Sequence, residues 1–403
     1  MNSIYRQVKH SGVAAIALTM LAAVVLLAGI AIPAQAQTET VLYSFQGSPS
    51  GSGPDGSAPA AGPILVGTTL YGTTLWGGAY GVGSVWAVST TTGKETILYS
   101  FQGGASDGEY PYGGLAYYKG SFYGTTANGP TPGYQGGIIF KLTKKGKKYV
   151  ETILHEFTGP EGSGPMYVIP VFDKEGNLYG TTSGGGADSA GVVFKMSPSG
   201  EITVLHSFDY NCPPCDGFTP LGGVSIDAKG NLYGQTNGGG TYDWGTVYEI
   251  TAAGGYNILY NFDVTDGYNA LAPPVLKKNI LWGTTEGSGG AYGTVYKLNP
   301  KTGQRTLIHQ FTGYPDGASP GAGPFVFDKE GNLYDTSGAG AAECGTIYKV
   351  TPAGDLTYLY NFTCQPDGFN PWGSVVFDKS GNIYTTTTQG GTNNVGAVIK
   401  LTP

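Results

Sequence analysis

The hydrophobic positions of this chain fall in short runs separated by turn residues. Between residues 168 and 208, four runs have the length and the β-branched and aromatic content of strands, namely residues 168–173, 178–182, 192–196 and 202–208. Tight turns that contain Gly join the first run to the second and the third to the fourth, whereas a longer Gly-rich segment joins the second to the third. The pattern predicts a unit of four antiparallel strands.

This unit recurs along the chain. Its second run, Asn-Leu-Tyr-Gly-Thr-Thr at residues 177–182, has variants at residues 69–74, 121–126, 231–236, 279–285, 332–337 and 382–387. The Phe that ends the fourth run recurs as Phe45, Phe101, Phe157, Phe208, Phe262, Phe311 and Phe362. A repeat of about 50 residues with four strands is typical of a propeller blade. We therefore expect an all-β chain that forms a seven-bladed β-propeller of four-stranded blades.

The two ends of the repeat array complement each other. Residues 39–45 copy the fourth run, and residues 396–402 copy the third, so the last blade lacks its own outer strand. We expect residues 39–45 to pair with residues 396–402 and close the ring, because closure removes unpaired strand edges. Within the second run, Asp335 and Thr385 replace the usual Gly, and they mark the blades in which asymmetry is expected first.

In a propeller, the fourth-to-first and second-to-third connections share one face, here called the loop face, and the tight turns share the opposite face, here called the hairpin face. The connections of the loop face are long and variable in this chain, whereas the tight turns are short and regular. Because function concentrates in loops on a rigid scaffold, we expect a ligand site on the loop face or at the centre of the ring there.

Composition supports this interpretation. The chain has 403 residues with 69 Gly and 29 Tyr, and only 12% of its residues are charged. Low charge with many aromatic residues is the opposite of the composition of disordered chains, and abundant Gly is unfavourable in helices. Many short strands joined by turns remain the best interpretation.

Residues 1–36 differ from the rest of the chain. Arg6 and Lys9 precede an apolar run at about residues 13–32, which is followed by Ala34-Gln35-Ala36, a small-x-small cleavage site. We expect residues 1–36 to be a signal peptide, and residues 37–403 to form a single propeller domain with no membrane span. The apolar run is also long enough to remain as an uncleaved anchor. Either way the protein is expected to be exported, to a periplasmic, extracellular or cell-surface location.

The formal net charge is −7, and loss of residues 1–36 removes two of the 21 basic side chains and none of the 28 acidic ones. Such a surface repels phosphate backbones, so a nucleic acid is not an expected partner. The one basic run, residues 144–148, is interpreted as a solvated turn, with contact to an anion as the alternative.

The cysteines are Cys212, Cys215, Cys344 and Cys364. An even number in an exported chain favours disulfides, with Cys212 closing a small loop to Cys215 and leaving Cys344 for Cys364. The Cys-x-x-Cys spacing also occurs in zinc and redox sites, but no second ligand pair of zinc-site spacing is evident and a strand–helix setting is missing.

A repeated acid is the first candidate for chemistry. The connection after each Phe carries Asp-Gly, which gives Asp55, Asp107, Asp216, Asp266, Asp316 and Asp367, with Glu161 in the remaining unit. A ring of carboxylates would suit a cation or a hydroxyl-rich ligand. Alternatively, each acid bonds the backbone of its own turn. No cofactor or metal ligand set is predicted, and calcium is only a weak possibility because no EF-hand spacing occurs.

Aromatic residues in the long connections are the second candidate. Trp244 and Trp372 are the most informative, because aromatic faces beside acids suit sugar rings. The alternative is packing between blades. His155, His206 and His309 stand where other units have Tyr, which indicates packing with a polar edge rather than a metal triad. No catalytic residue is predicted.

The order of the four motifs resembles a known family. Residues 95–101, Glu-Thr-Ile-Leu-Tyr-Ser-Phe, then Asp-Gly, Gly-Asn-Leu-Tyr-Gly-Thr-Thr and Gly-x-Val-Phe/Tyr-Lys-Leu, resemble the GloVer-type tandem-repeat family over residues 39–403. The resemblance implies a bacterial protein that acts outside the cytoplasm. It implies no catalytic residue, because the family has no established activity.

Together these features favour a monomeric binding or interaction scaffold, with carbohydrate or another cell-surface molecule as its partner. One alternative is a polysaccharide-active enzyme, a hydrolase or lyase that uses carboxylates of the loop face at the defined separation such chemistry needs. The other is a purely structural envelope protein. Binding is favoured over catalysis because the acids recur in every unit instead of being unique to one or two.

Overall fold

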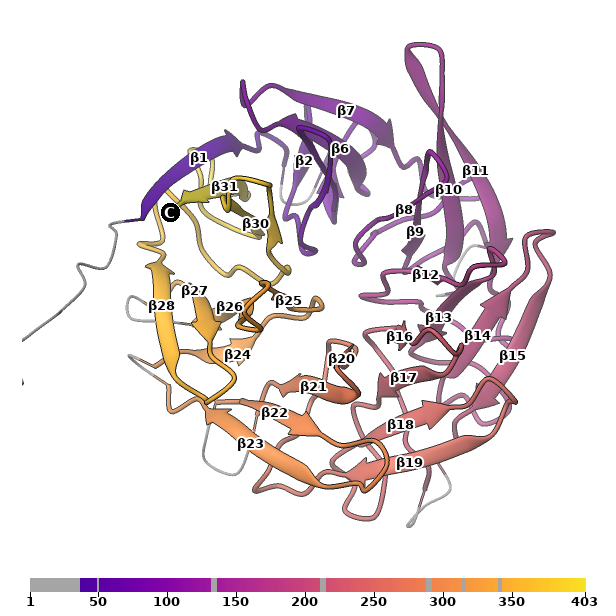
Figure 1. The fold of residues 1–403 in the computed structure, drawn as a ribbon. Helices are drawn as coiled ribbons and strands as arrows, with labels where there is room; N and C mark the ends of the chain where they lie inside the picture. The colour runs from indigo at the N-terminus through magenta and orange to yellow at the C-terminus, as the bar shows by residue number, and fades with distance from the viewer. Residues whose placement is uncertain are drawn as a thin grey trace, which may run out of the picture. The chain divides into compact units, whose positions relative to one another are not determined.

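The structure is a computed structural model that describes residues 37–48, 51–131, 136–210, 215–287, 292–313, 316–339 and 343–403. The predicted signal peptide lies outside the described residues. Glu39–Thr402 form one compact unit, and within this unit seven antiparallel sheets are arranged in a ring, as Figure 1 shows. This arrangement confirms the predicted seven-bladed propeller. Among the described residues, no helix is long and apolar enough to cross a membrane.

The first three blades follow the chain in order. Blade 1 contains β3 (Ile64–Val66), β4 (Thr69–Thr74), β6 (Ser84–Ser89) and β7 (Glu95–Ser100). Blade 2 contains β8 (Ala116–Tyr118), β9 (Ser121–Thr126), β10 (Ile138–Lys145) and β11 (Lys148–Glu156). Blade 3 contains β12 (Val171–Phe172), β13 (Leu178–Thr182), β14 (Val192–Met196) and β15 (Ile202–Ser207). The short β2 (Gly56–Ser57) and β5 (Trp76–Gly77) pair with each other beside blade 1.

Blades 4 and 5 repeat the same plan. Blade 4 contains β16 (Val224–Ile226), β17 (Leu232–Gln235), β18 (Thr246–Ile250) and β19 (Tyr256–Asn261). Blade 5 contains β20 (Val275–Lys277), β21 (Ile280–Thr285), β22 (Thr294–Leu298) and β23 (Arg305–Gln310).

The last two blades depart from the plan. Blade 6 contains β25 (Val326–Phe327), β26 (Leu333–Ala339), β27 (Thr346–Val350) and β28 (Leu356–Asn361), and a further short strand, β24 (Ala318–Pro320), pairs with β26. Blade 7 combines β29 (Val376–Phe377), β30 (Ile383–Thr387) and β31 (Ala397–Thr402) with β1 (Thr38–Ser44) from the start of the described chain.

Pairing of β1 with β31 closes the ring and confirms the predicted closure. Just beyond β1, the backbone N–H of Phe45 donates to the carbonyl of Gly396 at 3.0 Å. The Asn393 side chain donates to the carbonyl of Phe45, also at 3.0 Å. Both bonds join residues from the two ends of the described chain, so blade 7 fastens the ring.

The first strand of blade 3 is shorter than the sequence predicts. In blade 3 the expected strand at residues 168–173 is reduced to Val171–Phe172. Pro170 has no N–H to give to a ladder, which explains why pairing starts after it. The second and third strands of this blade match the predicted residues, and the fourth ends one residue before Phe208.

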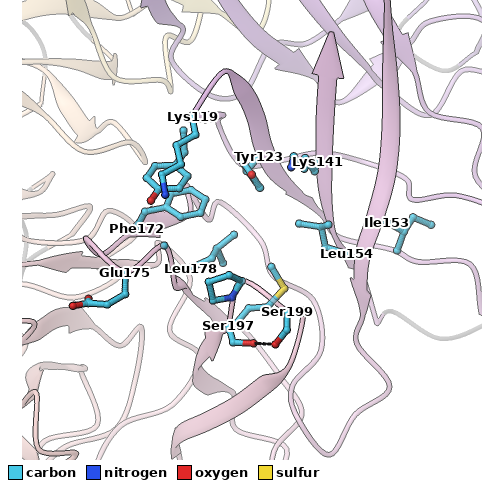
Figure 2. A pocket seen from close by; sticks show the side chains of 15 residues that line it. Lys119, Tyr123, Lys141, Ile153, Leu154, Phe172, Glu175, Leu178, Ser197 and Ser199 are labelled. Atoms are coloured by element: carbon cyan, nitrogen blue, oxygen red, sulfur yellow. Dashed lines mark hydrogen bonds between the residues drawn. The ribbon is translucent and has the colours of Figure 1, made fainter. Parts of the chain in front are cut away.

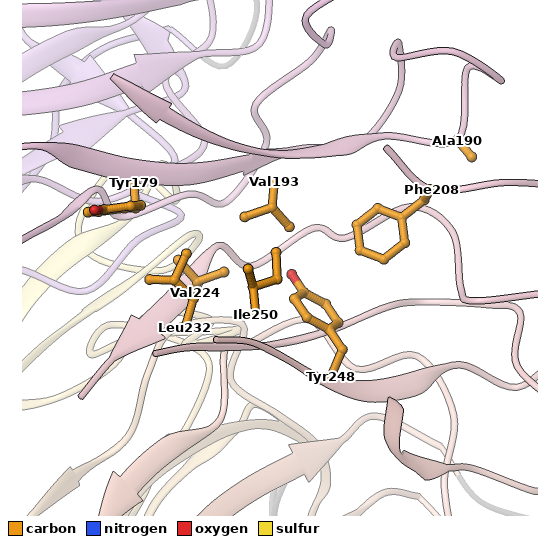
Figure 3. Close-up of a cluster of buried hydrophobic side chains, with 8 residues drawn as sticks. All are labelled: Tyr179, Ala190, Val193, Phe208, Val224, Leu232, Tyr248 and Ile250. Atoms are coloured by element: carbon orange, nitrogen blue, oxygen red, sulfur yellow. The ribbon is translucent and has the colours of Figure 1, made fainter. Parts of the chain in front are cut away.

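The hydrophobic core lies between neighbouring blades. Figure 3 shows one cluster, in which Val193 and Phe208 of blade 3 face Leu232, Tyr248 and Ile250 of blade 4. In the ladder, Gly234 stands directly opposite Tyr248, and a Cβ atom at residue 234 would collide with that ring. The repeated Gly of the second strand therefore makes room for the large residue of the third.

Polar side chains also join the blades near the centre of the ring. The hydroxyls of Thr73, Thr125, Thr336 and Thr386 each donate at 2.9 Å to a carbonyl of the next blade, and Gln235 Nε2 donates at 2.6 Å in the same way. These residues follow the repeated Gly position, so one short motif both admits the aromatic ring and ties adjacent blades. The seven-copy run at residues 177–182 is thus scaffold.

Candidate functional site

The repeated acids are occupied by hydrogen bonds within their own loops. In every blade the acid accepts the backbone N–H of the residue that follows the buried Phe. The donor–acceptor pairs are Gln46–Asp55, Gln102–Asp107, Thr158–Glu161, Asp209–Asp216, Asp263–Asp266, Thr312–Asp316 and Thr363–Asp367, at 2.8 to 3.2 Å. This is the turn-bonding role that the sequence allows as the alternative to a ligand-binding ring.

Each acid also contacts the Tyr or His that precedes the Phe by two residues. Tyr99 donates to Asp107 at 2.7 Å, and His206 Nε2 lies 2.6 Å from Asp216. Burial, followed by the bond to Asp107, raises the pKa of Tyr99 far above its usual value, so its hydroxyl stays protonated and donates. Asp55, Asp107 and Asp367 are 2 to 4% exposed. The repeated acids therefore hold their own loops.

The acids take part in contacts between blades as well. Glu95 lies beside Asp55 and Glu151 beside Asp107, and in both cases burial first and the neighbouring acid second raise the pKa of the Glu to about 7. Arg305 takes the corresponding position next to Asp266. Among the described residues, no group of three or more His, Cys, Asp or Glu is placed to hold a metal ion.

Exposed aromatic side chains gather on the loop face. Tyr242 and Trp244, in the second-to-third connection of blade 4, are 58% and 38% exposed, and Tyr292 in blade 5 is 53% exposed. The Trp244 ring lies 5.1 Å from Tyr268, which belongs to the connection between blades 4 and 5. These four residues form what we call the rim aromatics. Trp244, singled out in the sequence, is therefore accessible.

Trp372 belongs to a second group, at the centre of the loop face. Tyr167 of the connection into blade 3 lies 6.2 Å from Trp372 of the connection into blade 7, and 5.4 Å from Tyr112 of the connection into blade 2. Because blades 3 and 7 stand on opposite sides of the ring, the first contact spans its centre. We call Tyr112, Tyr167 and Trp372 the central aromatics. Sequence reasoning singled out Trp372 but not Tyr167.

Glu286 was also not singled out by the sequence. It follows the second strand of blade 5, where other blades have Leu75, Ala127, Ser183, Asn237, Gly338 and Thr388. Burial raises the pKa of Glu286 to about 7, and burial, Tyr112 and Glu286 together raise the pKa of Tyr167 to about 12. A half-buried carboxyl thus acts on Tyr167, one of the central aromatics. Its signal in the sequence was an acid found in one blade only.

Blade 6 is modified beside Trp372. Gly338 lies in the last part of its second strand, β26, and the Trp372 Nε1 atom lies 3.5 Å from the place that a Cβ atom of residue 338 would take. Asp335 replaces the repeated Gly and is completely buried, and it accepts a 3.2 Å bond from Tyr348. The asymmetry expected at Asp335 is real, and burial raises its pKa well above the usual range.

The hairpin face carries grooves between blades. Figure 2 shows one of about 390 Å³ between blades 2 and 3, lined by Tyr123, Phe172 and Leu178, with a 2.7 Å bond between Ser197 and Ser199 at its edge. A groove of about 370 Å³ recurs between blades 3 and 4. Because the feature repeats with the blades, it follows from their packing and does not single out one site.

A disulfide joins Cys344 to Cys364, as the sequence suggested. It links the second-to-third connection of blade 6 with the connection that carries Trp372. The N–H of Asn370, near Trp372, donates to the carbonyl of Cys344 at 3.0 Å. Cys215 is also disulfide-bonded, whereas Cys212 lies outside the described residues.

Seven four-stranded sheets around one centre, joined through buried Phe and repeated Gly residues, define a seven-bladed β-propeller built from tandem repeats. The chain belongs to the Gloeobacter/Verrucomicrobia repeat family, whose model matches residues 30–169, 69–292 and 286–403. No curated protein matches the sequence.

Several solved structures share the fold. An oligogalacturonate lyase from Vibrio parahaemolyticus is similar with a TM-score of 0.55 and 12% identity, over 92% of this chain and 94% of the other. The extracellular domain of a putative one-component system from B. thetaiotaomicron has a TM-score of 0.53 and 11% identity, over 88% of this chain but only 40% of that one. A putative 6-phosphogluconolactonase from Bacteroides uniformis has a TM-score of 0.52 and 14% identity, over 82% and 90%. At these identities the likeness concerns the fold alone.

Proposed function

We propose that this protein is an exported, monomeric binding scaffold that holds carbohydrate at a cell surface through its loop face. The observation that carries the proposal is the concentration of aromatic side chains there. Six aromatic residues are strongly exposed among the described ones, and Tyr80, Tyr210, Tyr242, Trp244 and Tyr292 lie in loop-face connections. Only Tyr117 lies elsewhere, beside a tight turn of the hairpin face.

The chemistry of this face suits sugars. Aromatic faces bury the apolar side of a pyranose ring, while nearby polar groups bond its hydroxyls. The rim aromatics supply such faces, and at the centre the carboxyl of Glu286 is close enough to Tyr167, the neighbour of Trp372, to raise the pKa of that Tyr. The acids Asp55, Asp107, Asp216, Asp266, Asp316 and Asp367 support this surface indirectly, by holding the loops that carry it.

Glycan binding can be tested with the mature protein on an array of surface polysaccharides. We expect specific retention, and a loss of about tenfold or more in affinity for Trp244→Ala or Trp372→Ala, since each removes one stacking face. Tyr117→Ala is the matched control, because it removes an exposed aromatic ring from the opposite face. Retention of neutral glycans that survives both Trp substitutions, or no retention of any glycan, would contradict the proposal.

The same array run with calcium and with a chelator addresses the cation alternative. Because the repeated acids are held by loop hydrogen bonds, we expect equal retention in both conditions. A calcium-dependent signal that disappears in Asp216→Asn would show instead that these acids bind a cation together with the glycan.

A polysaccharide-active enzyme is a second candidate, and one observation favours it. The pKa of Glu286 near 7 and its place beside the central aromatics suit a general acid or base. Incubation of a retained glycan with the protein tests this candidate. Product release that stops in Glu286→Gln, while retention persists, would favour the enzyme. Retention of the glycan without release of product would favour the binding scaffold over the enzyme.

A further inference from the structure

The hairpin of β10 and β11 in blade 2 is longer than the corresponding strands of the other blades. β10 has 8 residues and β11 has 9, whereas the corresponding third and fourth strands of the other blades have 5 to 7. Pairing continues to Lys145 and Lys148, so a two-residue turn of Gly146 and Lys147 ends the hairpin. Figure 1 shows it projecting beyond the outline of the ring.

The tip of this hairpin is basic and borders a groove. Lys144, Lys147 and Lys148 line one side of a groove of about 410 Å³, and Tyr149 continues this side. The Nζ atom of Lys144 lies 5.8 Å from the centre of the Tyr149 ring. The volume is within the range of small-molecule sites.

Blade 1 forms the opposite side. Tyr71 from β4, Ala87 from β6, and Ile97 and Leu98 from β7 line it. Burial is the larger cause, and the neighbouring Tyr71 the next, that raises the pKa of the Tyr149 hydroxyl to about 12. This hydroxyl therefore stays neutral and can donate a hydrogen bond. Apolar and aromatic surface, phenol hydroxyls and ammonium groups therefore meet in one groove.

The charge of this groove is opposite to that of the protein. The chain has a formal net charge of −7, yet none of the described residues that line the groove is acidic, and three are Lys. The turns at the same position of the other blades hold at most one Lys. Blade 1 has Lys94 and blade 5 has Lys301, whereas the turn of blade 3, residues 197–201, has none. A local positive site on an acidic protein selects an anion that approaches this edge of the ring.

We propose that the groove between blade 1 and the β10–β11 hairpin binds an acidic polysaccharide, with the carboxylates of uronate residues on Lys144, Lys147 and Lys148. The sugar ring packs on Tyr71, Tyr149 and the aliphatic floor, which a bare phosphate chain would leave unused. A flat anionic membrane fits less well, since only the tip of the hairpin is basic and the rest of the protein is acidic. The site is separate from the loop face and does not rest on the function proposed there.

The test compares two oligosaccharides that differ only in charge. Oligomers of β-1,4-linked mannuronate carry a carboxylate on each residue, and β-1,4-linked mannose oligomers are their neutral counterparts. By titration calorimetry at low salt we expect the mature protein to bind the mannuronate oligomer at least about tenfold more tightly, and this preference to shrink as salt is added.

Variants locate the binding. Lys144→Ala/Lys147→Ala/Lys148→Ala should lose about tenfold or more in affinity for the mannuronate oligomer, and the corresponding triple Arg variant should retain it. Lys174→Ala/Lys301→Ala/Lys329→Ala is the matched control, since it removes three exposed ammonium groups elsewhere and should bind as the unmodified protein does. These positions are exposed, and unfolding midpoints verify that each variant is folded.

Three outcomes would overturn the proposal. The first is equal affinity for the charged and neutral oligomers. The second is a loss of binding in the control triple variant that is as large as in the hairpin variant. The third is binding of single-stranded DNA or of anionic phospholipid vesicles that is as tight as binding of the mannuronate oligomer at equal salt. The last result would show a site that responds to negative charge alone. Because Trp244 and Trp372 are unchanged in all these variants, failure here is distinguishable from failure of the loop-face proposal.

Discussion

Arg305 of blade 5 reaches across the blade boundary to Asp266 of blade 4. Its Nη1 atom lies 3.8 Å from the Asp266 carboxylate, and its Nη2 atom donates to the Asp266 carbonyl. The Arg305 side chain is only 8% exposed. At the corresponding positions of other boundaries Glu39, Glu95 and Glu151 approach an acid instead. These four boundaries therefore place a charged side chain at the same position, but the sign of its charge differs.

Replacing Arg305 by Met should destabilise the protein by about 3 kcal/mol, because it leaves the partly buried Asp266 without its cation. The measurement is the urea midpoint at pH 7. Arg305→Glu would create the acid pair that other boundaries contain, and its loss of stability should be larger at pH 8 than at pH 5. Equal losses at the two pH values would contradict this account.

Stability should fall between about pH 4.5 and pH 7 through Glu95 and Glu151. Their pKa values in the folded protein are about 7, above the value of an unfolded Glu, so the folded state binds more protons in this window and deprotonation removes stability. After allowance for solvent screening, each contributes about 1 kcal/mol.

Glu95→Gln/Glu151→Gln should flatten this slope relative to the unmodified protein, as followed by urea midpoints at several pH values. The difference between the two proteins is the proper measure, since burial lowers the pKa of His155 and gives a contribution of opposite sign in the same window. Glu175→Gln, at an exposed turn, is the control and should leave the slope unchanged.

Asp335→Gly should stabilise the protein at pH 8 by about 1 to 3 kcal/mol. The substitution restores the residue that Gly234 and Gly283 supply opposite Tyr248 and Tyr296, and it removes a completely buried carboxyl. Because the raised pKa keeps this carboxyl protonated in acid, the gain should be smaller at pH 5. Thermal melts at both pH values would reveal the opposite order if the buried carboxyl were stabilising.

Cys344→Ser/Cys364→Ser should cost about 3 kcal/mol, because the bond closes a loop of 20 residues in sequence. The same variant should weaken glycan retention through Trp372, whose loop the disulfide holds. Retention that depends on Trp244 should change less. Comparison with Trp372→Ala on the same array separates the two effects, and an unchanged urea midpoint would show that the bond adds no stability.

Most of the fold was predictable because each strand carries its own local pattern and the pattern occurs seven times. Gly180 and Phe194, for example, stand at positions that also hold Gly and a large aromatic in neighbouring blades, and their pairing in the ladder explains both. The first strand of blade 3 was predicted too long, because Val168 is apolar and buried without belonging to the strand and Pro170 has no N–H for the ladder.

The candidate site was less predictable for a physical reason. Whether Asp107 bonds its own loop or a ligand depends on the place of the Tyr99 hydroxyl, which no spacing along the chain reveals. The contact of Tyr167 with Trp372 joins residues from opposite sides of the ring, so no local pattern encodes it. In the sequence Glu286 was detectable only as an exception to the repeat. Its relation to Tyr167 became visible only in the structure.

Closure through β1 and β31 also sets an order of events. Among the strands of the ring, β1 is synthesised before the others and its partner β31 after them, so β1 stays unpaired while the other strands are made. Until residues 396–402 emerge, the edge of β1 is open to wrong partners, including the third strands of earlier blades that carry the same motif. Closing the ring in this way makes the final folding step late and long-range. Molecules that have not yet completed this step can pair with one another through β1 of one copy and β31 of another.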